Sequence, residues 1–156
     1  MSLIEYGTTN PPGLTGEIPN IAFWSLISIA DFAAAEKLDN GITAARCMHA
    51  LTGARDDLNR QLSTWQDTQI AAGYSTAAGV PVPSYAVEGH FLRLYKRAVY
   101  ALAHASLMER YRNYSATPAG DERGEGKDIT ADDLRRDARW AVSEILGQSH
   151  TTVELI

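Results

Sequence analysis

The sequence contains one cysteine and no long hydrophobic run, and these two absences exclude several classes of protein. A lone cysteine, Cys47, excludes an internal disulfide and suits a reducing cytoplasm. It falls on the apolar stripe of a predicted helix, so we expect a buried core residue. No run of about 18 apolar residues exists, so we expect no transmembrane helix. The first ten residues also lack the basic and apolar regions of a signal peptide.

Catalytic motifs are absent as well. The four histidines (His49, His90, His104 and His150) show no spacing of four residues on one helix and have no cysteine at metal-ligand spacing. The sequence has no glycine-rich phosphate loop, no G-x-S-x-G motif and no Glu-x-x-His pattern of a di-iron bundle. We therefore predict that the chain is not an enzyme, and that it has no catalytic residues, metal or cofactor.

The charge is weakly acidic, with a net value of −5, which disfavours a protein whose whole surface binds nucleic acid. A local basic region remains, because Arg93, Lys96, Arg97 and His104 share one side of a predicted helix with Tyr100. Basic residues interleaved with aromatics can bind single strands or phosphates. A solvated polar face or ion pairs between subunits explains the pattern equally well.

What the sequence does contain is helical periodicity. One stripe repeats close to a heptad between residues 43 and 72, and another follows the 131–146 segment. Ser28 with Asp31, and Thr130 with its following acidic residues, are typical of helix starts, and Gly73 and Gly147 of helix ends. We predict an all-α fold: a small bundle of three to four helices, two of them long, over residues 29–38, 43–72, 87–114 and 131–146.

Three segments outside these helices complete the predicted organisation. Residues 1–22 are rich in glycine and proline and form an extended arm, which packs either on its own domain or on a neighbour. Residues 115–128 lack apolar periodicity and form a mobile loop, of a length that is often functional. Residues 149–156 form a short extended or β tail with an apolar end. A single helical domain over residues 23–148 lies between the arm and the tail.

The 87–114 helix carries two apolar stripes on opposite sides. The first runs through Phe91, Leu94, Tyr95, Ala98, Leu102 and Ala105. The second consists of Tyr100, Leu107, Tyr111 and Tyr114. Such a helix is either the centre of its own bundle or is shared between subunits. Trp140 poses a similar choice, because it points away from the apolar stripe of its helix. It either lies flat on its own polar helix or touches the loop before it, or it anchors a protein–protein contact.

Four sequence blocks point to a family. Trp65 to Gly73 (WQDTQIAAG), Arg97 to Val99, Ala105 to Arg112 (ASLMERYR) and Asp137 to Val142 (DARWAV) occur in this order, followed by a glycine-containing turn and a short tail. In this order and spacing, from Leu58 to the C-terminus, the chain resembles the head completion protein (L protein) of temperate contractile-tailed bacteriophages.

The resemblance implies a structural virion protein at the head–tail neck, assembled in the host cytoplasm. Such an adaptor binds the portal after DNA packaging, stabilises the filled capsid and offers a docking surface to tail terminator, completion or other neck proteins. It implies a homo-oligomer, by analogy a twelvefold ring, through which double-stranded DNA passes without sequence-specific binding. Alternatives are another neck component such as a tail completion protein, a small helical DNA-binding regulator, or an enzyme on a helical bundle.

If subunits assemble into a ring, two sets of residues are candidates for contacts with other subunits, with partner proteins or with DNA. The subunit or partner interface is predicted at Tyr100, Leu107, Tyr111, Arg112, Tyr114, Trp140, Leu155 and Ile156. The loop that lines the channel or docks the tail is predicted at Asp121, Glu122, Arg123, Glu125 and Lys127.

Overall fold

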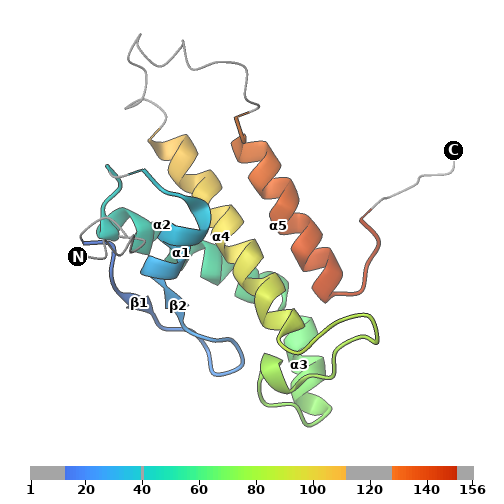
Figure 1. Cartoon of the computed structure of the whole chain (residues 1–156). Helices are drawn as coiled ribbons and strands as arrows, with labels where there is room; N and C mark the ends of the chain where they lie inside the picture. Colours follow the sequence, from blue (N-terminus) through green and yellow to red (C-terminus); the bar gives the residue numbers. More distant parts are fainter. Residues whose placement is uncertain (1–12, 40, 112–127, 151–156) are drawn as a thin grey trace, which may run out of the picture.

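The structure is a computed structural model that describes residues 13–39, 41–111 and 128–150. Within these ranges the chain is mostly helical, which confirms the predicted all-α class, with one small hairpin that the sequence did not reveal (Figure 1). The elements in chain order are β1 (Glu17–Ile18), β2 (Ile27–Ser28), α1 (Ile29–Glu36), α2 (Ala44–Gln61), α3 (Ser63–Ala71), the 3₁₀ turn η1 (Ala77–Gly79), α4 (His90–Arg110) and α5 (Ala131–Ile145).

Helix α4 occupies the centre of the bundle, with α2 and α5 packed along it and α1 against its middle (Figure 1). The described residues of both apolar stripes are therefore buried or half-buried by the same chain. Tyr95 on the first stripe is 1% exposed, and Tyr100 and Leu107 on the second are 5% and 3% exposed. Helix α1 supplies the cover over Tyr100, whose ring lies 5.4 Å from that of Phe32. The central-helix alternative holds here, and sharing α4 with a neighbour is not needed to hide these two side chains.

The predicted 43–72 helix is two helices, α2 and α3, joined at Leu62. The Ser63 hydroxyl donates a hydrogen bond back to the carbonyl of Arg60 at 2.9 Å, which is a side-chain contact that competes with the helical ladder and bends helices. Leu62 stays fully buried at the break. Because the apolar spacing continues across Leu62, periodicity alone could not separate the two helices.

The other helix boundaries follow their predicted signals closely. The Ser28 hydroxyl accepts from the backbone of Asp31 at 3.2 Å, and Thr130 with Asp133 forms a complete capping box. Helix α4 begins three residues later than predicted because Gly89 adopts a left-handed conformation at φ +81°. The Arg93 guanidinium donates to the Glu88 carbonyl at 2.7 Å and holds this turn. The predicted helix end at residues 112–114 lies outside the described residues.

The described part of the predicted N-terminal arm, residues 13–22, packs on its own helices. Leu14 and Ile18 are each 2% exposed, and β1 pairs with β2 in an antiparallel register that places Ile18 opposite Ile27. In the loop between β1 and β2, the Trp24 ring lies between two other aromatic rings. Its ring stacks on that of Tyr95, with centroids 4.2 Å apart, and on that of Trp65 at 6.0 Å. The hairpin thus contributes to the core.

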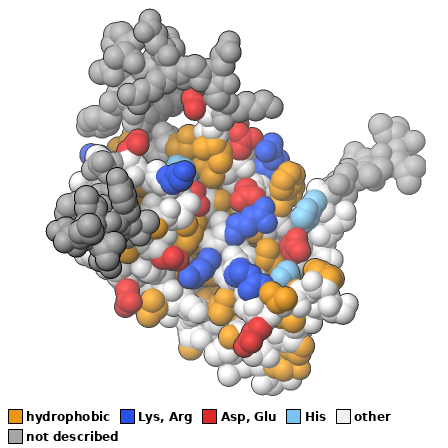
Figure 2. Space-filling view, in the orientation of Figure 1, with side chains coloured by type: hydrophobic (Ala, Val, Ile, Leu, Met, Phe, Trp, Pro, Cys, Tyr) orange, Lys and Arg blue, Asp and Glu red, His pale blue; other side chains and the backbone are white. Residues whose placement is uncertain are grey.

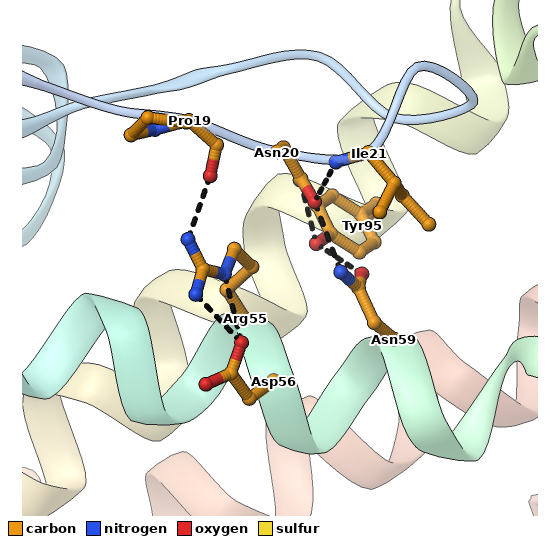
Figure 3. Close-up of polar contacts among 7 residues, drawn as sticks. All are labelled: Pro19, Asn20, Ile21, Arg55, Asp56, Asn59 and Tyr95. Carbon is orange, nitrogen blue, oxygen red and sulfur yellow. Dashed lines mark hydrogen bonds and ion pairs between the residues drawn. The ribbon is translucent and has the colours of Figure 1, made fainter.

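A closed set of hydrogen bonds fixes the hairpin to α2 and α4 (Figure 3). The Tyr95 hydroxyl donates to the Asn59 side-chain oxygen at 2.7 Å and accepts from the Asn20 amide at 2.9 Å. The Asn59 amide in turn donates to the Asn20 oxygen at 2.9 Å. Beside them the Arg55 guanidinium donates to the Pro19 carbonyl at 2.7 Å. Burial raises the pKa of Tyr95 to about 12, although the bond from Asn20 opposes that shift.

This geometry predicts the effect of Tyr95→Phe. The free energy of unfolding should fall by about 1–3 kcal/mol at neutral pH, because two part-buried amides lose a partner. Since the folded pKa lies above the unfolded value of about 10, the contribution of the hydroxyl is complete below pH 10 and is lost as the pH rises towards 12. Urea denaturation at about pH 7 and pH 11 measures both effects.

Tyr85→Phe is the matched control, because Tyr85 is 75% exposed and should tolerate the change at either pH. A stability loss in Tyr95→Phe that stays equal at both pH values would contradict the titration argument.

Candidate partner-binding surfaces

The predicted interface and loop residues fall into four groups. Tyr100 and Leu107 are buried, which corrects their assignment to a surface: α1 and α2 already cover this side of α4. Tyr111 is half-buried, with the Arg46 guanidinium 4.2 Å above its ring. Trp140 is on the surface. The remaining predicted residues lie outside the described ranges, namely Arg112, Tyr114, Asp121, Glu122, Arg123, Glu125, Lys127, Leu155 and Ile156.

Trp140 projects from the outer side of α5 and is 39% exposed. The His150 ring stacks on it, nearly parallel at 9°, with centroids 5.8 Å apart, and the Arg136 guanidinium lies 5.2 Å from the ring. His150 also approaches Glu144, at 3.6 Å. Trp140 therefore has features of both predicted alternatives. His150 and Arg136 of its own chain hold the indole, and more than a third of the residue still faces solvent. Holding a large aromatic side chain in advance reduces the entropy lost when a partner binds.

The basic side of α4 faces acidic residues of α1 and α5. Figure 2 shows these blue and red side chains intermingled on one face. Lys96 and the Tyr100 hydroxyl both reach Asp31, at 3.1 and 2.5 Å. The bond from Tyr100, and then that from Lys96, holds the pKa of Asp31 below its usual value against partial desolvation. Burial and the same carboxylate raise the pKa of Tyr100.

Two further pairs complete this charged face. Arg97 forms a salt bridge with Asp137 of α5, which raises the guanidinium pKa, and His104 lies 2.7 Å from Glu36 of α1. The sequence had left open whether these cations bind nucleic acid, face solvent or pair between subunits. Lys96, Arg97 and His104 contact carboxylates of the same chain, and Arg93 donates to backbone carbonyls, so the face offers little uncompensated positive charge to a phosphate backbone.

A groove of about 420 Å³ opens between α2 and α4, and sequence reasoning did not find it. Its floor contains Gly53 in the middle of α2, where an added Cβ would meet nothing within 4 Å. Only this glycine interrupts a helix that otherwise contains neither glycine nor proline, and that is the signal the sequence offered. The lining residues are His49, Ala50, Thr52, Gly53, Ala54, Asp56 and Asp57 of α2 with Leu102, Ser106 and Arg110 of α4.

The charges of the groove are unevenly distributed along its length. Helices α2 and α4 run antiparallel, since Arg46 contacts Tyr111 and Asn59 contacts Tyr95. Arg110 and His49 therefore lie near one end, and Asp56 and Asp57 towards the other. Each aspartate has an arginine partner, Arg55 and Arg60 respectively, whereas Arg110 has no ion pair or hydrogen bond among the described residues.

Exposed apolar side chains also occur in places that the sequence did not single out. Ile70 on α3 is 46% exposed, and Tyr85 and Val87 in the link before α4 are 75% and 68% exposed. Ile21 and Leu26, in the hairpin loop, are 43% and 51% exposed. The proline-containing link before α4 has no helical periodicity, so no periodic signal could predict an apolar surface there.

Neither metal binding nor membrane insertion is supported by the described residues. No cluster of three or more His, Cys, Asp or Glu side chains in them could hold a metal ion. None of the helices in this part of the chain has the length and apolar character required to span a bilayer.

Comparisons with known proteins assign the chain to a family. Residues 18–156 match the family model described as "Phage head completion protein (GPL)". The "Head completion/stabilization protein" of Escherichia phage P2 is 34% identical over 146 residues, covering 94% of this chain and 86% of the P2 protein. No solved structure matches. The chain belongs to the phage head completion protein family, whose members are structural proteins of the virion.

Proposed function

We propose that this protein is a head–tail adaptor. It binds the portal vertex after DNA packaging, stabilises the filled head at the neck of the virion and presents a surface to which the tail docks. The observation that carries this proposal is the match to a head completion/stabilization protein over 94% of the chain. It performs no chemistry in this role, and needs no cofactor, because retention and docking require only surfaces.

The distribution of exposed apolar side chains supports assembly into a ring. Trp140 on α5, Tyr85 and Val87 before α4, and Leu26 in the hairpin loop lie on separate elements. A closed ring with head-to-tail contacts buries two different patches of every subunit and leaves others for partners above and below. Each contact can be weak, because many linked contacts act together. We propose a homo-oligomeric ring, twelvefold by analogy with other adaptors.

The charge distribution suits a conduit for double-stranded DNA. Free lysine and arginine contacts would retain DNA phosphates at every step of its passage. The net charge is −5, and the basic side of α4 is paired with carboxylates of α1 and α5. We propose that Asp121, Glu122, Arg123, Glu125 and Lys127 form a loop that either lines the channel or docks the tail.

Two other functions compete with this proposal. A different neck component, such as a tail completion protein, would use similar surfaces against other partners, and portal binding distinguishes the two. A small DNA-binding regulator would require salt-dependent binding of duplex DNA by the isolated chain. The pairing of Lys96 and Arg97 within the chain disfavours the regulator.

Trp140→Ala tests the contact surface. We expect near-native helical content by circular dichroism and a stability change below about 0.5 kcal/mol, because more than a third of the side chain faces solvent. Assembly on the purified portal should weaken by about 30-fold, the effect of truncating a central aromatic anchor. Sedimentation and negative-stain imaging measure the assembly.

Arg139→Ala, at the neighbouring exposed position, should leave assembly unchanged. Tyr111→Ala belongs in the same series, since Tyr111 is half-buried under Arg46. A loss of the folded monomer in either aromatic variant would mean that the residue is structural and would contradict its role in a contact.

Charge reversal of Asp121, Glu122 and Glu125 to lysine tests the acidic loop. Slowed genome ejection is expected if the loop lines the channel, because three new cations per subunit would hold DNA phosphates. Loss of tail attachment with normal ejection is expected if the loop docks the tail. Phage yield, ejection rate and tail attachment that all match the wild type would contradict both roles.

A further inference from the structure

The groove between α2 and α4 and the exposed Trp140 on α5 match each other in shape and in charge. We propose that the groove of one subunit receives Trp140 of a second copy of this chain, so that the copies join head to tail. This inference rests on the self-association proposed above, and it names the two surfaces that meet.

The groove is shaped to take one large side chain. Its volume is about 420 Å³, and the lining residues around Gly53 are small, namely Ala50, Ala54 and Ser106. A Cβ added at Gly53 would meet nothing within 4 Å, so the space above this residue is open. Leu102 of α4 adds apolar surface to the same groove. An apolar floor of small residues suits an aromatic ring better than it suits a charged group.

Trp140 has the properties of a side chain that enters such a groove. It is 39% exposed, and its ring is held in place by the stacked ring of His150 and by the Arg136 guanidinium, 5.2 Å away. Tryptophan and arginine are enriched among the residues that dominate binding energy at interfaces. Because the ring is already held, it loses less entropy when a partner covers it.

The charges beside Trp140 form an ordered stripe along α5. Arg136 lies four residues before Trp140, and Glu144 lies four residues after it. Residues four positions apart share one side of a helix and are separated by about 6 Å along its axis. The stripe therefore runs from a cation through the indole to an anion.

The groove carries the opposite charges in the same spacing. Asp57 lies four residues after Gly53 on α2, and Arg110 of α4 lies at the other end of the groove beside His49, which is four residues before Gly53. With α5 of the second copy antiparallel to α2, the indole lies over Gly53, its neighbouring arginine faces Asp57 and its neighbouring glutamate faces Arg110. The opposite direction would place like charges together at both ends.

The charged groups set the direction of the contact more than its strength. Within one chain Arg136 already pairs with Asp133, and Asp57 already pairs with Arg60. Both pairs lie at the surface, where ion pairs contribute little to stability, so exchanging them for pairs between copies costs little. Burial of the indole supplies most of the affinity.

The positions of the two surfaces require a second copy. Trp140 follows Asp137 by three residues and shares the side of α5 through which Asp137 binds α4. The groove lies on the other side, because its lining residue Leu102 is seven residues before Glu109, which pairs with Arg135 on the opposite side of α5. A subunit therefore cannot fill its groove with its own Trp140, whereas a neighbour can. Repetition of this contact gives a head-to-tail assembly that can close into a ring.

Two full-length chains with complementary defects test the contact. One chain carries Trp140→Ala and keeps its groove, and the other carries Gly53→Leu, which fills the groove, and keeps its tryptophan. Each chain alone should self-associate about 30-fold more weakly than the wild type in sedimentation equilibrium. Their equimolar mixture should form a 1:1 dimer with about wild-type affinity and grow no further, because both remaining surfaces are defective.

Thr64→Leu, at an exposed position of α3, is the matched control for Gly53→Leu and should self-associate like the wild type. Since leucine replaces glycine in a helix interior, Gly53→Leu should melt at no lower a temperature than the wild type. A mixture without a 1:1 dimer at about 1 mM of each chain overturns the inference, as does equal self-association of Gly53→Leu and wild type. If the mixture fails while the wild type still assembles on the portal, only this contact is wrong and the proposed function stands.

An exchange of charges in the same mixture tests the direction. Arg136→Glu in the chain that keeps its tryptophan, or Asp57→Arg in the chain that keeps its groove, should weaken the dimer two- to fivefold, about the effect of an exposed ion pair. The two changes together should restore the affinity to within twofold. Arg139→Glu, exposed but off the charged stripe of α5, is the matched control and should give no restoration with Asp57→Arg. A dimer strengthened by Arg136→Glu alone overturns the inferred direction.

Discussion

The structure depends on one constraint, which is that α4 must be covered almost all the way round. Its buried residues face α2, α5 and α1 in turn. Each of these three helices therefore packs against a different side of the same central helix. A helix that is apolar on several sides is stable only inside a bundle. The side that remains partly open, around Leu102 and Ser106, becomes the groove.

The sequence predicted the parts of this fold that have local signals. The caps at Ser28 and Thr130 and the glycine endings at Gly73 and Gly147 are where the residue types indicated, because capping is a contact between near neighbours in the chain. The break at Leu62 and the β1–β2 hairpin were missed. The apolar spacing runs unchanged through the break, and two-residue strands are too short to produce an alternating pattern.

The site was harder to predict than the fold. Tyr100 was assigned to an interface because the sequence could not show that α1 folds back over it, a contact between residues 69 positions apart. Leu107 is buried within the bundle in the same way. The ion pairs of Lys96 and Arg97 and the contact of His104 with Glu36 are equally non-local, so the sequence could not show that these side chains already have partners. Trp140 was found correctly as an exposed aromatic, since its position on the helix wheel depends only on local spacing.

The hydrogen bonds among Asn20, Asn59 and Tyr95 have a consequence for how the chain folds during synthesis. Asn20 and Tyr95 are separated by 75 positions, and Trp24 stacks on the same tyrosine. The N-terminal hairpin therefore emerges from the ribosome long before its docking partner on α4 exists. Such non-local contacts form late, because the entropy of closing the long loop is lost before the contact stabilises the chain. Until then Phe23 and Trp24 stay uncovered, which makes the nascent hairpin a natural target for chaperones that bind exposed apolar segments.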